Sequence, residues 1–125
     1  MIIDKQLDDL KSSGYPGAIE SRRPDGSVLI TVPDIPLQGG WSKNSTSVRF
    51  FAPVGYPHAQ PDCFWADSDL RLVSGAMPQA TNISPIPGDG SASLWFSWHV
   101  SRWSPNRDSL LTYLKVIQNR LRECR

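Results

Sequence analysis

The chain has 125 residues, which is the usual size of one domain, so we expect a single domain over residues 1–125. Hydrophobic residues make up 39% of it and charged residues 20%, a balance that argues against a disordered chain and favours a packed core. A formal net charge of +1 gives no strong attraction to nucleic acid or anionic lipid, and no apolar run approaches the roughly 20 residues of a membrane helix, so we expect neither partner.

The start of the chain predicts a short helix and then a hairpin. Apolar residues at helical spacing predict the helix over residues 4–11, and its apolar face consists of Ile3, Leu7 and Leu10. Residues 18–23 and 27–32 have the composition of strands, and the Pro-Asp-Gly sequence between them is typical of a tight turn. The two strands therefore form an antiparallel hairpin.

Two more strands are predicted in the middle of the chain. They are residues 47–52 and the short segment 63–66, and the prolines between them exclude a central strand at residues 53–61. Residues 67–93 are rich in proline and glycine, which predicts a long irregular loop of the kind that often carries function. The strongly aromatic segment 94–100 follows this loop.

The last element is the best helix of the sequence. It is predicted over residues 104–121, where Ser104 suits the cap and Pro105 suits the first helical position. One apolar stripe runs along it, formed by Leu110, Leu114, Ile117 and Leu121. The order of elements predicts an α+β fold, in which a four-stranded antiparallel meander carries an N-terminal and a C-terminal helix packed on one face.

The cysteine count favours a reducing compartment. Cys63 and Cys124 are too few for a disulfide framework, and the N-terminus carries no secretion signal, so we expect a cytoplasmic protein with free thiols. The two cysteines and two histidines are scattered without ligand spacing, so no metal site is predicted. No glycine-rich phosphate loop is present, and we expect no cofactor.

Two motifs resemble those of the ubiquitin-conjugating enzymes. Residues 56–65 read Tyr-Pro-His-Ala-Gln-Pro-Asp-Cys-Phe-Trp, which is similar to the proline-rich bend that joins the third and fourth strands of that family. Residues 103–105 read Trp-Ser-Pro, which is similar to the Trp-x-Pro segment that opens the helix after the active-site region. This resemblance covers about residues 18–121 and implies the ubiquitin-conjugating fold.

The resemblance is closer to a group of short bacterial relatives called prokaryotic family E. Those proteins share the Pro-Asp-x-Phe-Trp segment, a loop similar to Met77-Pro78-Gln79 and an aromatic stretch that ends in a histidine, here His99. The resemblance implies a bacterial operon with an activating enzyme, a ubiquitin-like protein and a deconjugating peptidase. Several such operons are linked to defence against phage.

The sequence departs from the eukaryotic family at the catalytic position. There a His-Pro-Asn motif precedes a cysteine about eight residues before the tryptophan of Trp-x-Pro, which is near Trp95 in this chain. No cysteine lies between Cys63 and Cys124, so Cys63 becomes the candidate nucleophile for thioester chemistry. The alternative is a small buried side chain at the start of a strand.

His99 and Asn82 are the other two candidate catalytic residues. A neutral His99 can accept the proton of a thiol or of a lysine, although its aromatic neighbours also suit a structural histidine. Asn82 can stabilise an oxyanion through its amide, although a loop asparagine is more often a turn former.

We expect a protein that accepts a ubiquitin-like protein from an activating enzyme as a cysteine thioester and passes it to a lysine of a target protein. The alternative is a catalytically inactive module of the same fold that binds the ubiquitin-like protein or the activating enzyme non-covalently. Fold alone does not decide between the two.

Overall fold

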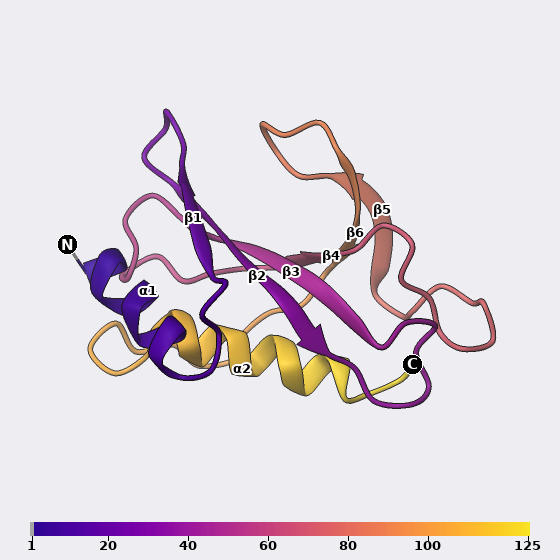
Figure 1. The fold of residues 1–125 in the computed structure, drawn as a ribbon. Helices are drawn as coiled ribbons and strands as arrows, with labels where there is room; N and C mark the ends of the chain where they lie inside the picture. Colours follow the sequence, from indigo (N-terminus) through magenta and orange to yellow (C-terminus); the bar gives the residue numbers. More distant parts are fainter. Residues whose placement is uncertain (1) are drawn as a thin grey trace.

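The structure, a computed structural model, describes residues 2–125. It contains one antiparallel sheet that packs on two helices (Figure 1). Helix α1 (Ile2–Ser12) opens the chain and helix α2 (Leu110–Leu121) comes near its end. The sheet order is β1-β2-β3-β4-β6-β5. The strands are β1 (Ile19–Arg22), β2 (Val28–Pro36), β3 (Ser45–Ala52), β4 (Phe64–Ala66), β5 (Thr81–Pro85) and β6 (Ala92–Phe96). The predicted α+β class is confirmed.

The sheet has six strands where the sequence predicts four. Strands β1 to β4 are sequential neighbours, and the β5–β6 hairpin extends the sheet beyond β4. The prediction of an irregular loop over residues 67–93 is wrong at β5, whose residues pair one by one with β6 from Thr81↔Phe96 to Pro85↔Ala92. Pairing with a neighbouring strand overrides the weak local preference here, and Pro85 is tolerated because β5 is an edge strand.

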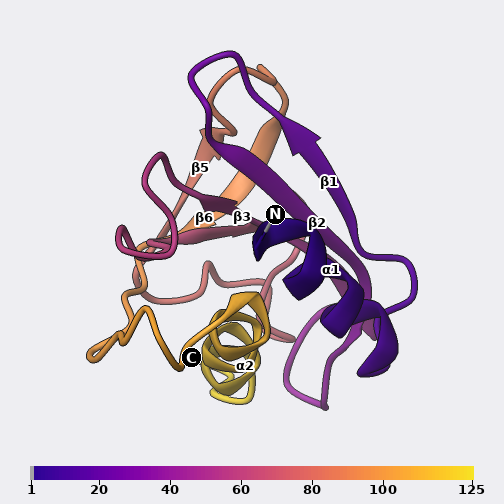
Figure 2. The same cartoon turned by 90° about the vertical axis from the view of Figure 1, so that its left-hand side faces the viewer.

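Both helices lie on the same face of the sheet (Figures 1 and 2). The predicted apolar face of α1 is buried, and so is the predicted stripe of α2. These side chains pack against the inward-facing residues of the strands and form the main core. The central sheet residues of that core include Ile30, Val48, Phe50, Phe64 and Phe96. Neither helix among residues 2–125 has the length and apolar character that crossing a membrane requires.

Helix α2 begins at Leu110 and not at Pro105, so the predicted start is wrong by five residues. The backbone N–H of Ser104 donates to Asp108 Oδ2 at 2.6 Å, which closes a turn ahead of the helix. Ser109 is the N-cap, and the N–H of Leu110 donates to the buried Gln6 Oε1 at 3.1 Å. Gln6 lies on α1, so a residue 104 positions away accepts one of the first N–H groups of α2, beside the local bond from the Ser109 N–H to Thr112 Oγ1 at 3.0 Å.

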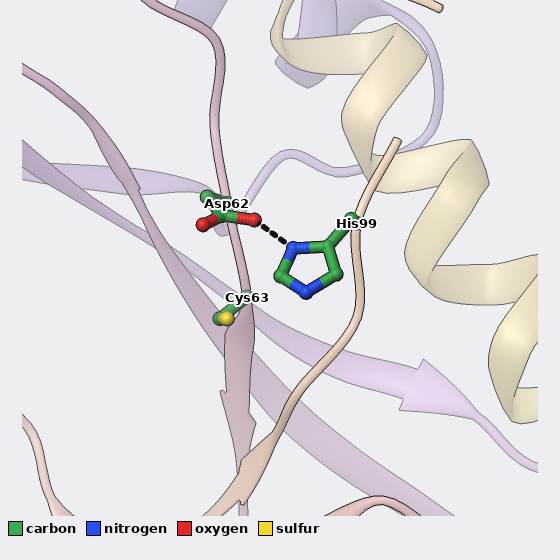
Figure 3. A group of neighbouring side chains, drawn as sticks. All are labelled: Asp62, Cys63 and His99. Carbon is green, nitrogen blue, oxygen red and sulfur yellow. Dashed lines mark hydrogen bonds and ion pairs between the residues drawn. The ribbon is translucent and has the colours of Figure 1, made fainter. Parts of the chain in front are cut away.

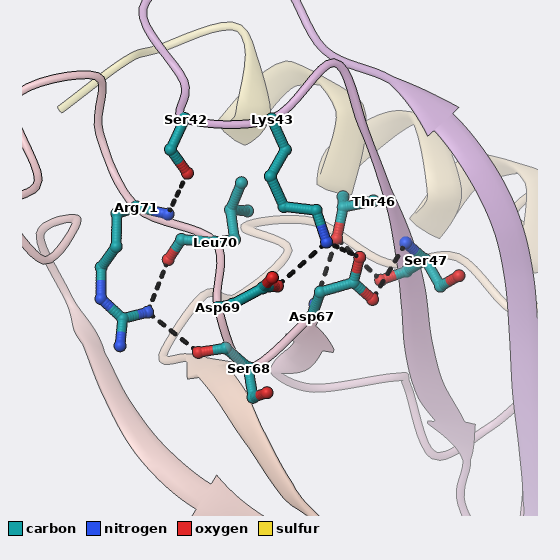
Figure 4. Close-up of polar contacts among 9 residues, drawn as sticks. All are labelled: Ser42, Lys43, Thr46, Ser47, Asp67, Ser68, Asp69, Leu70 and Arg71. Carbon is teal, nitrogen blue, oxygen red and sulfur yellow. Dashed lines mark hydrogen bonds and ion pairs between the residues drawn. The ribbon is translucent and has the colours of Figure 1, made fainter.

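A polar cluster fixes the chain where it leaves β4 (Figure 4). Lys43 Nζ donates to Asp67 Oδ2 at 2.8 Å and to Asp69 Oδ1 at 2.9 Å. These two bonds raise the pKa of Lys43. The backbone N–H of Asp67 donates to Thr46 Oγ1 at 3.1 Å. The half-exposed ion pairs contribute on the order of 1 kcal/mol or less each, so their effect is to hold the short strand β4 in register.

Candidate active site

Three side chains that carry chemistry meet at the start of β4 (Figure 3). Asp62 and Cys63 directly precede β4, and His99 follows β6, which pairs with β4 through Phe64↔Phe96. One ligand atom from each of the three side chains, including the Cys63 sulfur, lies within 4.8 Å of the other two. Asp62 Oδ1 and His99 Nδ1 are joined by a hydrogen bond. The sheet thus brings together two segments that are 37 residues apart in the chain.

The backbone of Cys63 is fixed from two sides. Its φ of 61° lies in the left-handed region, which a residue with a side chain adopts at a cost on the order of 1 kcal/mol. The Cys63 N–H donates to the Trp98 carbonyl at 2.9 Å, and the Tyr113 hydroxyl donates to the Cys63 carbonyl at 2.9 Å. The same hydroxyl donates to the Trp98 carbonyl at 3.3 Å. These bonds maintain the left-handed conformation and therefore the direction in which the sulfur points.

The Asp62–His99 bond sets the proton arrangement of the imidazole. An ionised carboxylate can only accept hydrogen bonds, so Nδ1 of His99 carries the proton in the neutral ring. Nε2 is then left with a free lone pair and can accept a proton. The His99 side chain is 61% exposed and the Asp62 side chain 58% exposed, so both can be reached from solution.

The Cys63 thiol is not ionised in advance. Burial raises the pKa of Cys63, and the negative charge of Asp62 raises it further. Hydrogen bonds from the Trp98 backbone and the Trp95 side chain lower this pKa but do not outweigh burial. A partly buried thiol of this kind needs a base to remove its proton when it attacks.

The third predicted site residue, Asn82, lies elsewhere. It is on β5, an edge strand, and its backbone partner across the sheet is Trp95 on β6. Its exposed side chain accepts a hydrogen bond from the N–H of Ile83 at 2.9 Å. Strand β6 separates β5 from β4, so the structure brings together Cys63 and His99 but not Asn82.

A family model described as prokaryotic E2 family E matches residues 5–124 of the chain, which is nearly its whole length. The chain belongs to prokaryotic E2 family E. It is therefore an E2-like protein, similar to ubiquitin-conjugating enzymes, and the resemblance inferred from the sequence is confirmed. Neither the curated proteins nor the solved structures contain a match to this chain.

In this family E protein, two residues that the sequence did not identify contact the candidate site residues. Asp62 was visible only as an acidic neighbour of Cys63, and its bond to His99 depends on the pairing of β4 with β6. Tyr113 lies beside the predicted stripe of α2 and is fully buried. A buried tyrosine hydroxyl usually has a hydrogen-bond partner. The presence of a tyrosine at a buried position of α2 was therefore the only feature of the sequence that could have indicated this contact.

A buried arginine supports the segment that carries His99 in the family E protein. Arg120 lies over the rings of Phe96 and Trp98, with its guanidinium carbon 5.1 and 5.3 Å from their centres. Its nitrogens donate to main-chain oxygens of Gln79, Glu123 and Arg125 at 2.8–2.9 Å. The guanidinium therefore holds Trp98, the residue next to His99, against α2.

Proposed function

We propose that this family E protein accepts a ubiquitin-like protein on Cys63 as a thioester and passes it to a lysine amine. The observation that carries the proposal is the meeting of Cys63, His99 and Asp62 at one end of β4. In this arrangement the cysteine is the nucleophile, the histidine is the base, and the aspartate orients the imidazole.

The first step is exchange between two thiols. The ubiquitin-like protein arrives as a thioester on an activating enzyme, and the Cys63 sulfur bonds to its carbonyl carbon while the thiol proton moves to Nε2 of His99. The bond to the activating enzyme's sulfur then breaks, and the departing thiolate takes up a proton. A separation of up to 4.8 Å between the sulfur and the other ligand atoms is loose, as it often is before a reactant binds.

The second step transfers the carrier to nitrogen. A lysine amine attacks the same carbonyl carbon, its proton passes to His99, and Cys63 leaves as a thiolate. Exposure of His99 is consistent with this step, since the approaching amine needs access to the base.

The position of Cys63 relative to Trp95 also supports the proposal. In the eukaryotic pattern the catalytic cysteine falls near Trp95, which here lies on β6 and pairs directly with Trp65 on β4. Cys63 lies two residues before Trp65, so it lies on the neighbouring segment at the same region of the sheet. In this interpretation the catalytic cysteine lies next to β4 in this protein, whereas in the eukaryotic pattern it falls at the position of the neighbouring strand β6.

The test is adduct formation with the activating enzyme and ubiquitin-like protein of the same bacterium in the presence of ATP. We expect an adduct that a thiol reagent removes, because thiols exchange with thioesters. Cys63→Ser should give a slower, reductant-resistant ester or no adduct, and Cys124→Ser is the matched control and should behave as the wild type. An adduct that survives Cys63→Ser but is lost in Cys124→Ser would contradict the proposal.

A second candidate function is non-covalent binding of the carrier or the activating enzyme. The raised pKa of Cys63 favours it, because the thiol is not activated before a partner arrives. This function predicts that the carrier binds in a pull-down while no adduct forms under any condition. It also predicts that Cys63→Ser leaves that binding unchanged.

We also propose that the pathway acts in the bacterial cytoplasm and in defence against phage. A reducing compartment suits a protein whose two cysteines are free, and the defence role rests on the resemblance to family E operons. Cells that carry the operon should yield fewer plaques than cells that carry it with Cys63→Ser. Equal plaque counts would contradict a defence role that depends on this thiol.

A further inference from the structure

Asp62, Cys63 and His99 offer three kinds of metal ligand at one place. A carboxylate oxygen, a thiol sulfur and an imidazole nitrogen lie within 4.8 Å of one another, and within residues 2–125 no second group of this kind is found. The sequence predicted no metal site because these residues have no ligand spacing. The three side chains are distant in the sequence but close in the fold, because the pairing of β4 with β6 places His99 beside residues 62–63.

We propose that these three side chains bind a zinc ion, with the fourth tetrahedral position open to water. Zinc is bound at about 2.3 Å by sulfur and about 2.0–2.2 Å by nitrogen and oxygen, which places tetrahedral ligand atoms about 3.3–3.7 Å apart. The longest side of the present arrangement, up to 4.8 Å, must close by about 1.1–1.5 Å, and the hydrogen-bonded Asp62–His99 side must open to about 3.3 Å. Exposed side chains can make this adjustment by rotation, and both Asp62 and His99 are exposed.

The donor set selects the kind of metal. A thiolate and a carboxylate contribute two negative charges, which balance a divalent cation, and the imidazole binds as a neutral ligand. Calcium and magnesium prefer oxygen ligands only, whereas sulfur and nitrogen suit zinc. Binding forms a bond from Cys63 Sγ to zinc and releases the thiol proton to solvent. The direct Asp62–His99 bond is exchanged for two bonds to the metal, and the neutral imidazole keeps its one proton on the ring nitrogen that does not bind zinc.

A zinc ion at this place would use the same sulfur lone pair that attacks a thioester. Metal binding and carrier transfer would then exclude each other, and Cys63 could not react with a thioester until the zinc ion dissociated. This consequence rests on the proposed function. Metal binding itself rests on the geometry alone, so the two can fail separately.

The first experiment is titration of the reduced, chelator-stripped full chain with zinc chloride in a calorimeter. We expect one ion per chain, and an affinity at least about tenfold weaker in Cys63→Ser and in His99→Ala. His99 is an exposed side chain, and a melting temperature of His99→Ala within about 2 °C of the wild type shows that loss of binding is not loss of the fold. Cys124→Ser is the matched cysteine control and should bind as the wild type does. Failure to bind one ion, or unchanged binding in both Cys63→Ser and His99→Ala, would overturn the proposal.

The second experiment measures protection of the thiol without any partner protein. Zinc should slow the alkylation of Cys63 by iodoacetamide at least about tenfold and leave Cys124, an internal reference in the same chain, unchanged. Chelator should restore the rate. Equal rates for Cys63 with and without zinc would overturn the proposal even if carrier transfer occurs, and protection without any carrier adduct would support the metal site while contradicting the proposed function.

Discussion

Tyr113→Phe removes a single hydroxyl that links α2 to the site. That hydroxyl donates to the Cys63 carbonyl at 2.9 Å and to the Trp98 carbonyl at 3.3 Å, and the tyrosine is fully buried. Burial raises the pKa of Tyr113, so the hydroxyl stays protonated and remains a donor. The Trp98 carbonyl keeps the Cys63 N–H as a donor, whereas the Cys63 carbonyl loses its bond to the tyrosine. A fully buried acceptor that loses its donor costs about 1–3 kcal/mol, and because Cys63 is only partly buried we expect the free energy of unfolding to fall by about 1 kcal/mol, the lower end of that range.

Urea denaturation with the Tyr113→Phe variant measures this change, and the slope of the transition should be unaltered. Alkylation of Cys63 should become faster, because the backbone that directs the sulfur is less firmly held. Tyr15→Phe is the matched control: its half-buried hydroxyl accepts a bond from Gln118 Nε2 at 2.7 Å, far from the site in sequence. We expect that change to cost less than about 1 kcal/mol and to leave Cys63 alkylation unaltered. A change below about 0.5 kcal/mol in Tyr113→Phe, with no effect on Cys63, would refute the reasoning.

Three further predictions follow from the core and the site. Leu114→Ala should lower the free energy of unfolding by about 2–5 kcal/mol, because Leu114 is fully buried and a cavity replaces its side chain; a change under about 0.5 kcal/mol in a denaturant melt would contradict its place in the core. His99→Ala should slow carrier transfer while the melting temperature stays within about 2 °C of the wild type, because the side chain is exposed; a melting temperature that falls together with activity would indicate a structural role. The raised pKa of Cys63 leaves less thiolate at pH 7, so with chelator present Cys63 should be alkylated more slowly at this pH than a cysteine peptide, and its alkylation rate should still increase above the peptide's pKa of about 8.5. Asp62→Asn removes a negative charge that raises this pKa and should therefore speed the alkylation of Cys63 at pH 7. Equal alkylation rates in the wild type, the variant and the peptide would contradict this environment of Cys63.

Local patterns predicted the elements that depend on local spacing. The apolar stripe of α2 and the apolar face of α1 are buried as the helical period predicts. The prolines of residues 53–61 separate β3 from β4 as expected. These elements could be predicted from the sequence because the residues that define each of them are close together in the chain.

The elements that depend on distant partners were not predictable in the same way. Strand β5 forms because β6 pairs with it, and the N–H of Leu110 at the start of α2 donates to Gln6 on the distant helix α1. Likewise Cys63 and His99 could be named from residue type and resemblance, but the bond from Asp62 to His99 follows from sheet pairing across 37 residues. No spacing rule in the sequence reports such a contact.

The most direct measurement is the location of the carrier on the chain. The protein, its activating enzyme, the ubiquitin-like protein and ATP are mixed, digested without reducing agent at mildly acidic pH and examined by tandem mass spectrometry. The account predicts that the C-terminal residues of the carrier are attached to the peptide that contains Cys63, and that thiol treatment releases them. Attachment to the Cys124 peptide, or carrier binding without attachment to either cysteine, would contradict it.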